Sequence, residues 1–477
     1  MVRRVRVLVW IGLGGLGCLT LLIAIACIRY GGPDELLLRL RAQLASYRPH
    51  PQWVPTPLPR PSASAPPPSQ PAMPDNPPVT VHPVAISPPP GPRASSSEQA
   101  PLTVTPAGRC TIEPGQQSAQ VALAPPTLTL PLPSHTPVHR PAQSSVELTG
   151  ITHVWQKWNN CGPATLAMYL SYFGSTLGQD ELAAALKGNR DDKNVSPEEM
   201  VTFVLANGYQ ATARINGSPD RLRLLLSNGL PVMIETWLEE EPGNGMGHYR
   251  LLTGYDDLRR EWIVFDSYVS KGVSANEPYR GIRLAYDEME HLWSVFNHTY
   301  LLIYDAARRP LVVSILGQEL DDVTMWQRAV EQASAEVKLR PDDPFAWFNL
   351  GSDRVALGQF ESAVVAYERA RMIGLPWRML WYQFGPFRAY YETGAITELV
   401  ALARATIATQ GEVEETYYWL GKGLAAQGHH AAALQAWHHA LELNPRYTEA
   451  SAAIEAARQQ PTTPDARLWR TRQQATG

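Results

Sequence analysis

The pattern of apolar and polar residues divides the chain into segments of contrasting character. An uncharged apolar run extends from Val7 to Ile28, and a stretch rich in Pro, Ser, Thr and Ala follows from residue 49 to about residue 145. Apolar residues then recur at helical spacing, short apolar runs typical of strands come next, and a repeating helical pattern begins near residue 317. A chain of 477 residues with these changes of pattern is predicted to contain several domains.

The first 30 residues are predicted to form a transmembrane anchor. As a helix, the apolar run would be about 33 Å long, which is enough to cross a hydrocarbon core of about 30 Å. Arg3, Arg4 and Arg6 precede the run, and basic residues favour the cytoplasmic side. The prediction is a single-pass protein of the cell membrane with the bulk of the chain extracytoplasmic. A cleaved signal peptide is the alternative, although its apolar core is usually shorter, about 7–15 residues.

Residues 31–145 are predicted to be a disordered linker. A Pro-, Ser- and Thr-rich segment cannot bury enough apolar surface to fold alone, and it should act as an extended tether. Two stretches inside it have some pattern: residues 34–47 have leucines on one side of a helix, and residues 119–132 alternate in the manner of strands.

Residues 146–308 are predicted to form an α+β domain. The helical stretches come first and the strand-like runs follow, which favours helices packed on an antiparallel sheet. Ser196-Pro197-Glu198-Glu199 has the capping hydroxyl, first-turn proline and early acids of a helix start. The predicted helices are 161–174, 179–186, 196–208 and 218–227, and the predicted strands are 231–236, 248–255, 261–266 and 299–304.

Cys161 lies at the start of the first predicted helix of this domain. Gly162 permits a sharp turn and Pro163 suits the first helical turn. A thiol placed there experiences the positive end of the helix dipole, which favours the thiolate. An isolated cysteine is more often a small buried hydrophobe, so the functional interpretation depends on the other residues of the domain.

Three further residues complete a candidate catalytic set in chain order. Gln156 precedes the cysteine and could donate to an oxyanion. His248 opens one predicted strand and Asp266 ends the next, so both could lie at one end of the sheet, with the imidazole as base and the carboxylate as its orienter. Rivals in the domain for the histidine and aspartate roles are His153, His291, His298, Asp256 and Asp257, of which His298 is the strongest because it also begins a strand.

These segments resemble the bacteriocin-processing, double-glycine peptidase family of papain-like cysteine proteases. The resemblance is carried by Gln156 and Asn160-Cys161-Gly162-Pro163-Ala164, then by residues 248–255 and 263–266. It implies Cys161 as nucleophile, His248 as base, Asp266 as orienter, Gln156 in the oxyanion hole, and a peptide substrate cleaved after a pair of small residues. This sequence departs from the family in having Ser267 where proline is common, and no transporter or ATPase pattern accompanies the domain.

Residues 317–460 resemble tetratricopeptide repeats. Trp347, Gly351 and Tyr367 recur 70 residues later as Tyr417, Gly421 and Trp437, which is two periods of about 35 residues, close to the repeat length of about 34. Small residues would allow close helix crossing, with the aromatic residues filling the gap. Such repeats stack into a curved surface that usually binds peptides or proteins, although a structural brace for the preceding domain is the alternative. Residues 461–477 are predicted to be a disordered tail.

Composition and charge exclude several other function classes. The net charge is −4, and no long basic run supports nucleic-acid binding. The four cysteines have neither a disulfide framework nor metal-ligand spacing, so no metal or cofactor is predicted. The predicted function is peptide-bond hydrolysis, with a peptide or protein substrate and a protein partner at the repeats. The alternatives are an inactive peptide-binding scaffold and acyl transfer through the same thiol.

Overall fold

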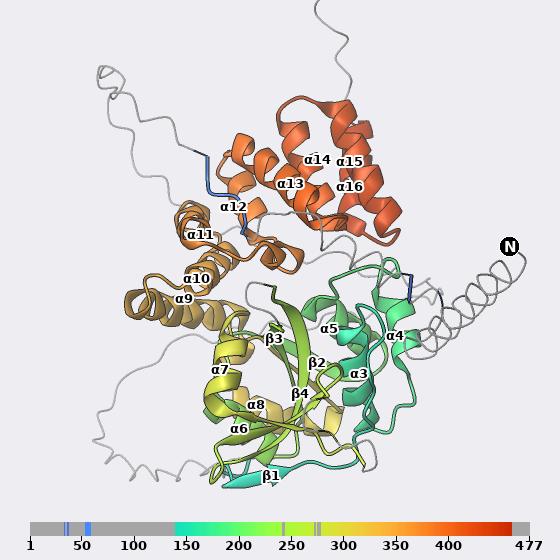
Figure 1. Cartoon of the computed structure of the whole chain (residues 1–477), viewed down its shortest axis with the longest axis vertical. Helices are drawn as coiled ribbons and strands as arrows, with labels where there is room; N and C mark the ends of the chain where they lie inside the picture. Colours follow the sequence, from blue (N-terminus) through green and yellow to red (C-terminus); the bar gives the residue numbers. More distant parts are fainter. Residues whose placement is uncertain are drawn as a thin grey trace, which may run out of the picture. The chain divides into compact units, whose positions relative to one another are not determined.

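The computed structural model describes residues 33, 36–37, 53–58, 139–240, 244–270, 273 and 278–459 (Figure 1). The chain divides into two units, residues 60–136 and the remainder, and all described residues belong to the latter. The predicted anchor, the possible strands at 119–132 and the predicted tail lie outside these ranges. Within the described ranges, no helix combines the length and apolar character that crossing a bilayer requires.

The first domain contains an antiparallel sheet in the strand order β2-β7-β3-β4-β5-β6, with β1 paired to β4. The four predicted strands are present, and their observed ends differ from the predicted ends by no more than two residues. Three strands were not predicted, because β1 has three residues, β2 is composed largely of small and polar residues, and β6 has four residues at the sheet edge. The strands are β1 Ser145–Glu147, β2 Gln210–Arg214, β3 Val232–Leu238, β4 Met246–Asp256, β5 Glu261–Asp266, β6 Ile282–Ala285 and β7 Tyr300–Tyr304.

Helices cover both faces of this sheet. Alternate residues of each strand point to opposite faces, so Met233 packs with α3, α4 and α5, whereas Val232 and Ile234 pack with α6, α7 and α8. Burial on both faces agrees with the many apolar residues of the central strands, among which Glu235, His248 and Arg250 are buried polar exceptions. The helices are α3 Cys161–Ser171, α4 Gln179–Leu186, α5 Pro197–Ala206, α6 Pro219–Ser227, α7 Tyr286–Ser294 and α8 Arg309–Leu316.

The local signals at the helix starts are confirmed. The Ser196 hydroxyl accepts from the Glu199 N–H at 3.2 Å, and the Glu199 carboxylate accepts from the Ser196 N–H at 2.8 Å, which forms a capping box at α5. Helices α7 and α8 were not predicted. Helix α8 lies beyond the predicted end of the domain at residue 308, yet its Val312 and Leu316 are buried in the cluster that contains α6.

The C-terminal region is a succession of helices that includes the predicted repeats. Gly351 lies against Tyr367, where a methyl group on the glycine would come within 2.7 Å of the ring, and Gly421 lies closer still to the ring of Trp437. These close crossings match the pattern of small and aromatic residues. The elements are α9 Asp322–Leu339, α10 Pro344–Ala356, α11 Phe360–Ile373, the 3₁₀ helix η3 Trp377–Trp381, α12 Gly385–Glu392, α13 Ile396–Gln410, α14 Glu414–Ala426, α15 His430–Leu443 and α16 Thr448–Gln459.

One hydrophobic cluster joins the sheet domain to the helical region. Trp237 of β3 and Phe296, which follows α7, are buried together with Phe348 of α10 and Tyr367 of α11. Buried apolar surface of this kind stabilises the contact between the two regions.

A short piece of the predicted linker also packs on the helical region. Val54 donates its N–H to the Leu375 carbonyl at 2.8 Å, and the Leu58 N–H donates to the Glu398 carboxylate at 3.0 Å. Arg371 donates to the Pro55 carbonyl at 2.8 Å and forms an ion pair with Glu398 at 2.6 Å. Residues 53–58 therefore occupy a fixed position, whereas the sequence predicted a disordered linker throughout 31–145.

Candidate active site

Cys161 is the first residue of α3, as the sequence predicted for the start of a helix. The preceding loop is held by one buried amide side chain. The Gln179 Oε1 atom accepts from the Lys157 N–H at 2.8 Å and the Asn160 side chain at 3.3 Å, and its Nε2 donates to the Trp155 carbonyl at 2.8 Å. The thiol is therefore presented from a fixed loop at the positive end of a helix dipole.

Cys161 is partly exposed, and its thiol interacts with His248. Burial opposes its ionisation, but the hydrogen bond to His248, the positive charge of that residue and the backbone N–H groups of Tyr249 and Gly162 together lower the thiol pKa below its ordinary value. This environment favours a thiolate at lower pH than for a free cysteine.

His248 and Asp266 come from neighbouring strands, as the sequence predicted. Arg250 of β4 lies opposite Asp266 of β5, and His248 lies two residues earlier on the same face. The His248 Nε2 atom is 3.0 Å from Asp266 Oδ1, and both side chains are buried. Because Nε2 is engaged with the carboxylate, Nδ1 is the nitrogen left for the thiol. Burial lowers the pKa of His248, but the charge and hydrogen bond of Asp266 outweigh this effect and raise it.

Asp266 accepts from four donors. Besides His248, its Oδ1 accepts the backbone N–H groups of Tyr268 and Val269, each at 2.8 Å, and its Oδ2 accepts from Arg250 Nε at 2.9 Å. Burial would raise the pKa of this carboxyl, but the cationic partners and hydrogen bonds hold it far below its usual value. The aspartate therefore both caps a turn and orients the imidazole. The sequence analysis did not predict the contact of Arg250 with Asp266. Its position two residues after His248 places it on the same face of the strand, and this spacing could have indicated the contact.

Gln156 lies beside the same strand end. Its backbone N–H donates to the Ser267 carbonyl at 2.8 Å, and the Ser267 hydroxyl donates to its Oε1 at 2.8 Å. The side-chain oxygen is thereby occupied, which fixes the amide plane and leaves Nε2 available as a donor. The serine that departs from the family pattern therefore has a specific structural contact.

The rival residues occupy other positions. His298 is hydrogen-bonded to Glu290 at 2.7 Å, and His291 is exposed on α7. His153 contacts the Asp266 backbone carbonyl at 2.8 Å and stacks on Tyr279. The two turn aspartates are engaged between β4 and β5: Asp256 accepts from Arg259, and Asp257 accepts from Tyr286.

The helical region contacts the segment just before His248. Arg378 of η3 donates to the Asn244 carbonyl at 2.9 Å and to the Asn244 side chain at 2.6 Å, within the glycine-rich loop that precedes His248. Tyr382 follows η3 and packs on Gly247, where a methyl group on the glycine would lie 3.0 Å from the ring. The sequence did not indicate these contacts, because they join residues more than a hundred positions apart.

Comparison with known families agrees with this arrangement. Residues 147–299 match the Peptidase_C39 like family, and residues 414–447 match the tetratricopeptide repeat. The chain joins a C39-like peptidase domain to tetratricopeptide repeats. This confirms the resemblance identified from the sequence, and the repeat match indicates a protein-binding region.

The individual proteins that resemble this chain share little sequence identity with it. A putative C39-like peptidase from Bacillus anthracis has 16% identity and a TM-score of 0.27, covering 34% of this chain and 98% of its own. A thermophilic repeat protein of Thermus thermophilus has 17% identity and a TM-score of 0.25, covering 32% of this chain and 82% of its own. The human Protein O-mannosyl-transferase TMTC1 is 26% identical over 166 residues, which is 34% of this chain. The chain spans only 16% of the length of that curated relative.

Proposed function

We propose that this protein is a membrane-anchored, extracytoplasmic cysteine peptidase that hydrolyses peptide bonds through Cys161, His248 and Asp266, with Gln156 in the oxyanion hole. The observation that supports it best is the buried pair of His248 and Asp266, 3.0 Å apart, whose imidazole, despite the opposing effect of burial, lowers the pKa of the Cys161 thiol at the start of α3. Few structural roles require a partly exposed thiol with a lowered pKa beside a buried, oriented imidazole.

Each residue has a distinct role in this reaction. The Cys161 thiolate attacks the scissile carbonyl carbon, and the oxyanion that forms accepts from Gln156 Nε2 and the Cys161 backbone N–H. The His248 imidazolium gives its proton to the departing amine, which leaves a thioester on Cys161. A water molecule then attacks the thioester while His248 takes its proton, and the carbon–sulfur bond breaks to release the acid product and the Cys161 thiolate. Asp266 holds the ring throughout.

The repeats are proposed to recruit the substrate or a partner protein, since stacked repeats present an extended binding surface. The membrane anchor is proposed from the apolar run at Val7–Ile28 and the arginines before it. A reporter enzyme that works only outside the cytoplasm should be active in cells when it is fused after residue 477. If a reporter that works only inside the cytoplasm is active at that position instead, the proposed orientation is refuted.

The catalytic proposal is tested by labelling and hydrolysis with the full chain. Iodoacetamide should alkylate Cys161 at neutral pH faster than it alkylates a free thiol, and Cys161→Ala should abolish hydrolysis of peptide substrates. Cys110→Ala, which removes a cysteine from the proline-rich segment, is the matched control and should retain activity. Slow labelling of Cys161 would instead support a peptide-binding scaffold. Product analysis with an added amine would identify acyl transfer, because the thioester is common to both reactions.

A further inference from the structure

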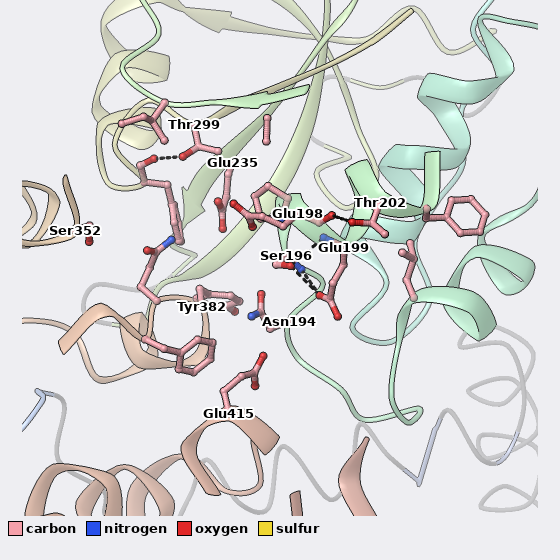
Figure 2. Close-up of a pocket in the computed structure, with 18 of the residues that line it drawn as sticks. Asn194, Ser196, Glu198, Glu199, Thr202, Glu235, Thr299, Ser352, Tyr382 and Glu415 are labelled. Carbon is pink, nitrogen blue, oxygen red and sulfur yellow. Dashed lines mark hydrogen bonds between the residues drawn. The ribbon is translucent and has the colours of Figure 1, made fainter. Parts of the chain in front are cut away.

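A large cavity lies between the peptidase domain and the repeats. Its volume is about 810 Å³, and both regions contribute to its lining. Five carboxyl groups line it: Glu198 and Glu199 from α5, Glu235 from β3, Glu415 from α14 and Glu449 from α16. Figure 2 shows Glu415 projecting from its helix toward Asn194 and Tyr382, with Glu235 on the opposite side.

The two guanidinium groups that line the cavity are engaged elsewhere. Arg214 pairs with Asp322, and Arg446 donates to the backbone carbonyls of Ala184 and Lys187 at 3.1 and 2.5 Å. Neither bond involves a carboxylate of the cavity. The cavity lining therefore carries an excess of acidic groups over basic groups.

Two of the carboxyl groups have an oxygen without a hydrogen-bond partner. Within the described ranges, Oε2 of Glu235 and Oε2 of Glu415 are buried and unpaired. Glu235 is only 3% exposed and lines the cavity. An unpaired buried acceptor is costly in free energy, so a donor that enters the cavity would relieve that cost.

The cavity lies near the start of α3, the helix that begins at Cys161. Burial raises the pKa of Glu235 well above its usual value, and the negative charges of Glu198 and Cys161 raise it further. Glu235 lies opposite Tyr249 in the sheet, so both side chains point to the face that α3 and α5 cover, and His248 points to the other face. The Tyr249 hydroxyl donates to the carbonyl of Val195, which lies between the cavity-lining residues Asn194 and Ser196. A methyl group on Gly162, the residue after Cys161, would lie 3.3 Å from Val195. Tyr382, which lines the cavity, packs on Gly247, the residue before His248. A peptide bound at the thiol would therefore extend readily into this space.

A metal ion is a poor candidate for the occupant. Nowhere in the described part of the chain do three His, Cys, Asp or Glu side chains come together in a way that could hold a metal. The cavity lining instead mixes carboxyl groups with apolar side chains such as Phe203, Met325 and Phe384. A lysine or arginine side chain combines an aliphatic stem with a cationic, multiply donating head, which suits both kinds of lining.

We propose that this cavity, defined by Glu235 and Glu415 on opposite sides, binds lysine or arginine side chains of the peptide whose scissile bond is presented to Cys161. The proposal deepens the peptidase function and rests on it. It makes the repeats part of the substrate site, because Glu415 and Tyr382 come from the helical region. The peptidase domain alone would have an incomplete cavity.

The test measures binding separately from cleavage. Fluorescent peptides that share a Gly-Gly pair and differ only in having Lys, Gln or Glu at the flanking positions are titrated against the full chain carrying Cys161→Ser. The Lys peptides should bind about tenfold more tightly than the Gln peptides, and added salt should reduce the difference. The double variant Glu235→Gln with Glu415→Gln should remove most of the preference. Glu361→Gln, an exposed change on α11, is the matched control and should preserve it.

The outcomes are distinguishable. Equal binding of Lys and Gln peptides, or a preference that survives in the double variant, would refute the cationic subsite even if the wild type cleaves peptides. A charge preference without alkylation of Cys161 or cleavage by the wild type would retain the subsite and refute the peptidase. Because glutamine is close in shape to glutamate and keeps a side chain that can form hydrogen bonds, the double variant should fold, which thermal unfolding verifies.

Discussion

Replacing Asp266 by asparagine should raise the pH at which Cys161 becomes reactive. The carboxylate lies 3.0 Å from the His248 imidazole, so its attraction for the imidazolium is about 5 kcal/mol at an effective dielectric constant of about 20. Arg250 contacts the other oxygen of the carboxylate and lowers the His248 pKa, so the net effect is smaller, about 1–3 kcal/mol. That corresponds to a loss of about ten- to hundredfold in reactivity at neutral pH.

The direction of the pH shift follows from the two pKa values. In the wild type, burial opposes ionisation of Cys161, but His248 lowers the thiol pKa, so the thiolate persists as pH falls until that lowered pKa is reached. The His248 pKa is raised, so the imidazolium persists as pH rises. Without the Asp266 charge the His248 pKa falls and the thiol pKa rises. The acidic limb of reactivity therefore moves to higher pH, and the range over which thiolate and imidazolium coexist becomes narrower.

The assay is the alkylation rate of Cys161 by iodoacetamide from about pH 4 to about pH 10, followed by peptide mapping so that the other cysteines are excluded. Asp287→Asn, an exposed change on α7, should leave the curve unchanged. Asp266→Asn strands the buried charge of Arg250, which destabilises the fold by about 3–5 kcal/mol. Adding Arg250→Met should recover stability without restoring the acidic limb. Coincident acidic limbs for the wild type and Asp266→Asn would refute the electrostatic reasoning.

Two further changes test other contacts of the structure. Ser267→Ala frees the Gln156 amide from its 2.8 Å hydrogen bond. The value of kcat should fall about 3–30-fold with little change in KM, which is a smaller effect than the loss of a whole oxyanion donor. A change in KM alone would contradict the positioning role. Glu398→Gln breaks the buried ion pair with Arg371 and weakens the attachment of residues 53–58. Thermal unfolding should show that the free energy of unfolding falls by about 3–5 kcal/mol, and a protease should cleave residues 53–58 faster. An unchanged cleavage rate would show that other contacts hold this segment.

The sequence by itself determined the local features of the fold. The capping hydroxyl of Ser196, the helix that begins at Cys161 and the apolar strands around His248 depend on residues within one turn or one strand, so pattern alone located them. The close helix crossings at Gly351 and Gly421 were predictable for a similar reason, because each repeat encodes the small and aromatic residues of its own crossing.

The chain order of Gln156, Cys161, His248 and Asp266 also singled out these residues among several histidines and aspartates. His298 was the strongest rival of His248, because the pattern predicted a strand directly after it. The antiparallel register pairs Arg250 with Asp266 and so places His248, not His298, beside the carboxylate.

Only the tertiary structure revealed that Ser267 holds Gln156 and that Tyr382 reaches Gly247. It also brought Glu235 and Glu415 to the same cavity from positions 180 residues apart. None of these contacts has a periodic signature, because each joins separate elements whose relative placement depends on how the whole core packs. Short-range pattern determines where helices and strands form and which faces they bury. The chemistry of a site between two regions is set by long-range packing, and it appears only once both regions are in place.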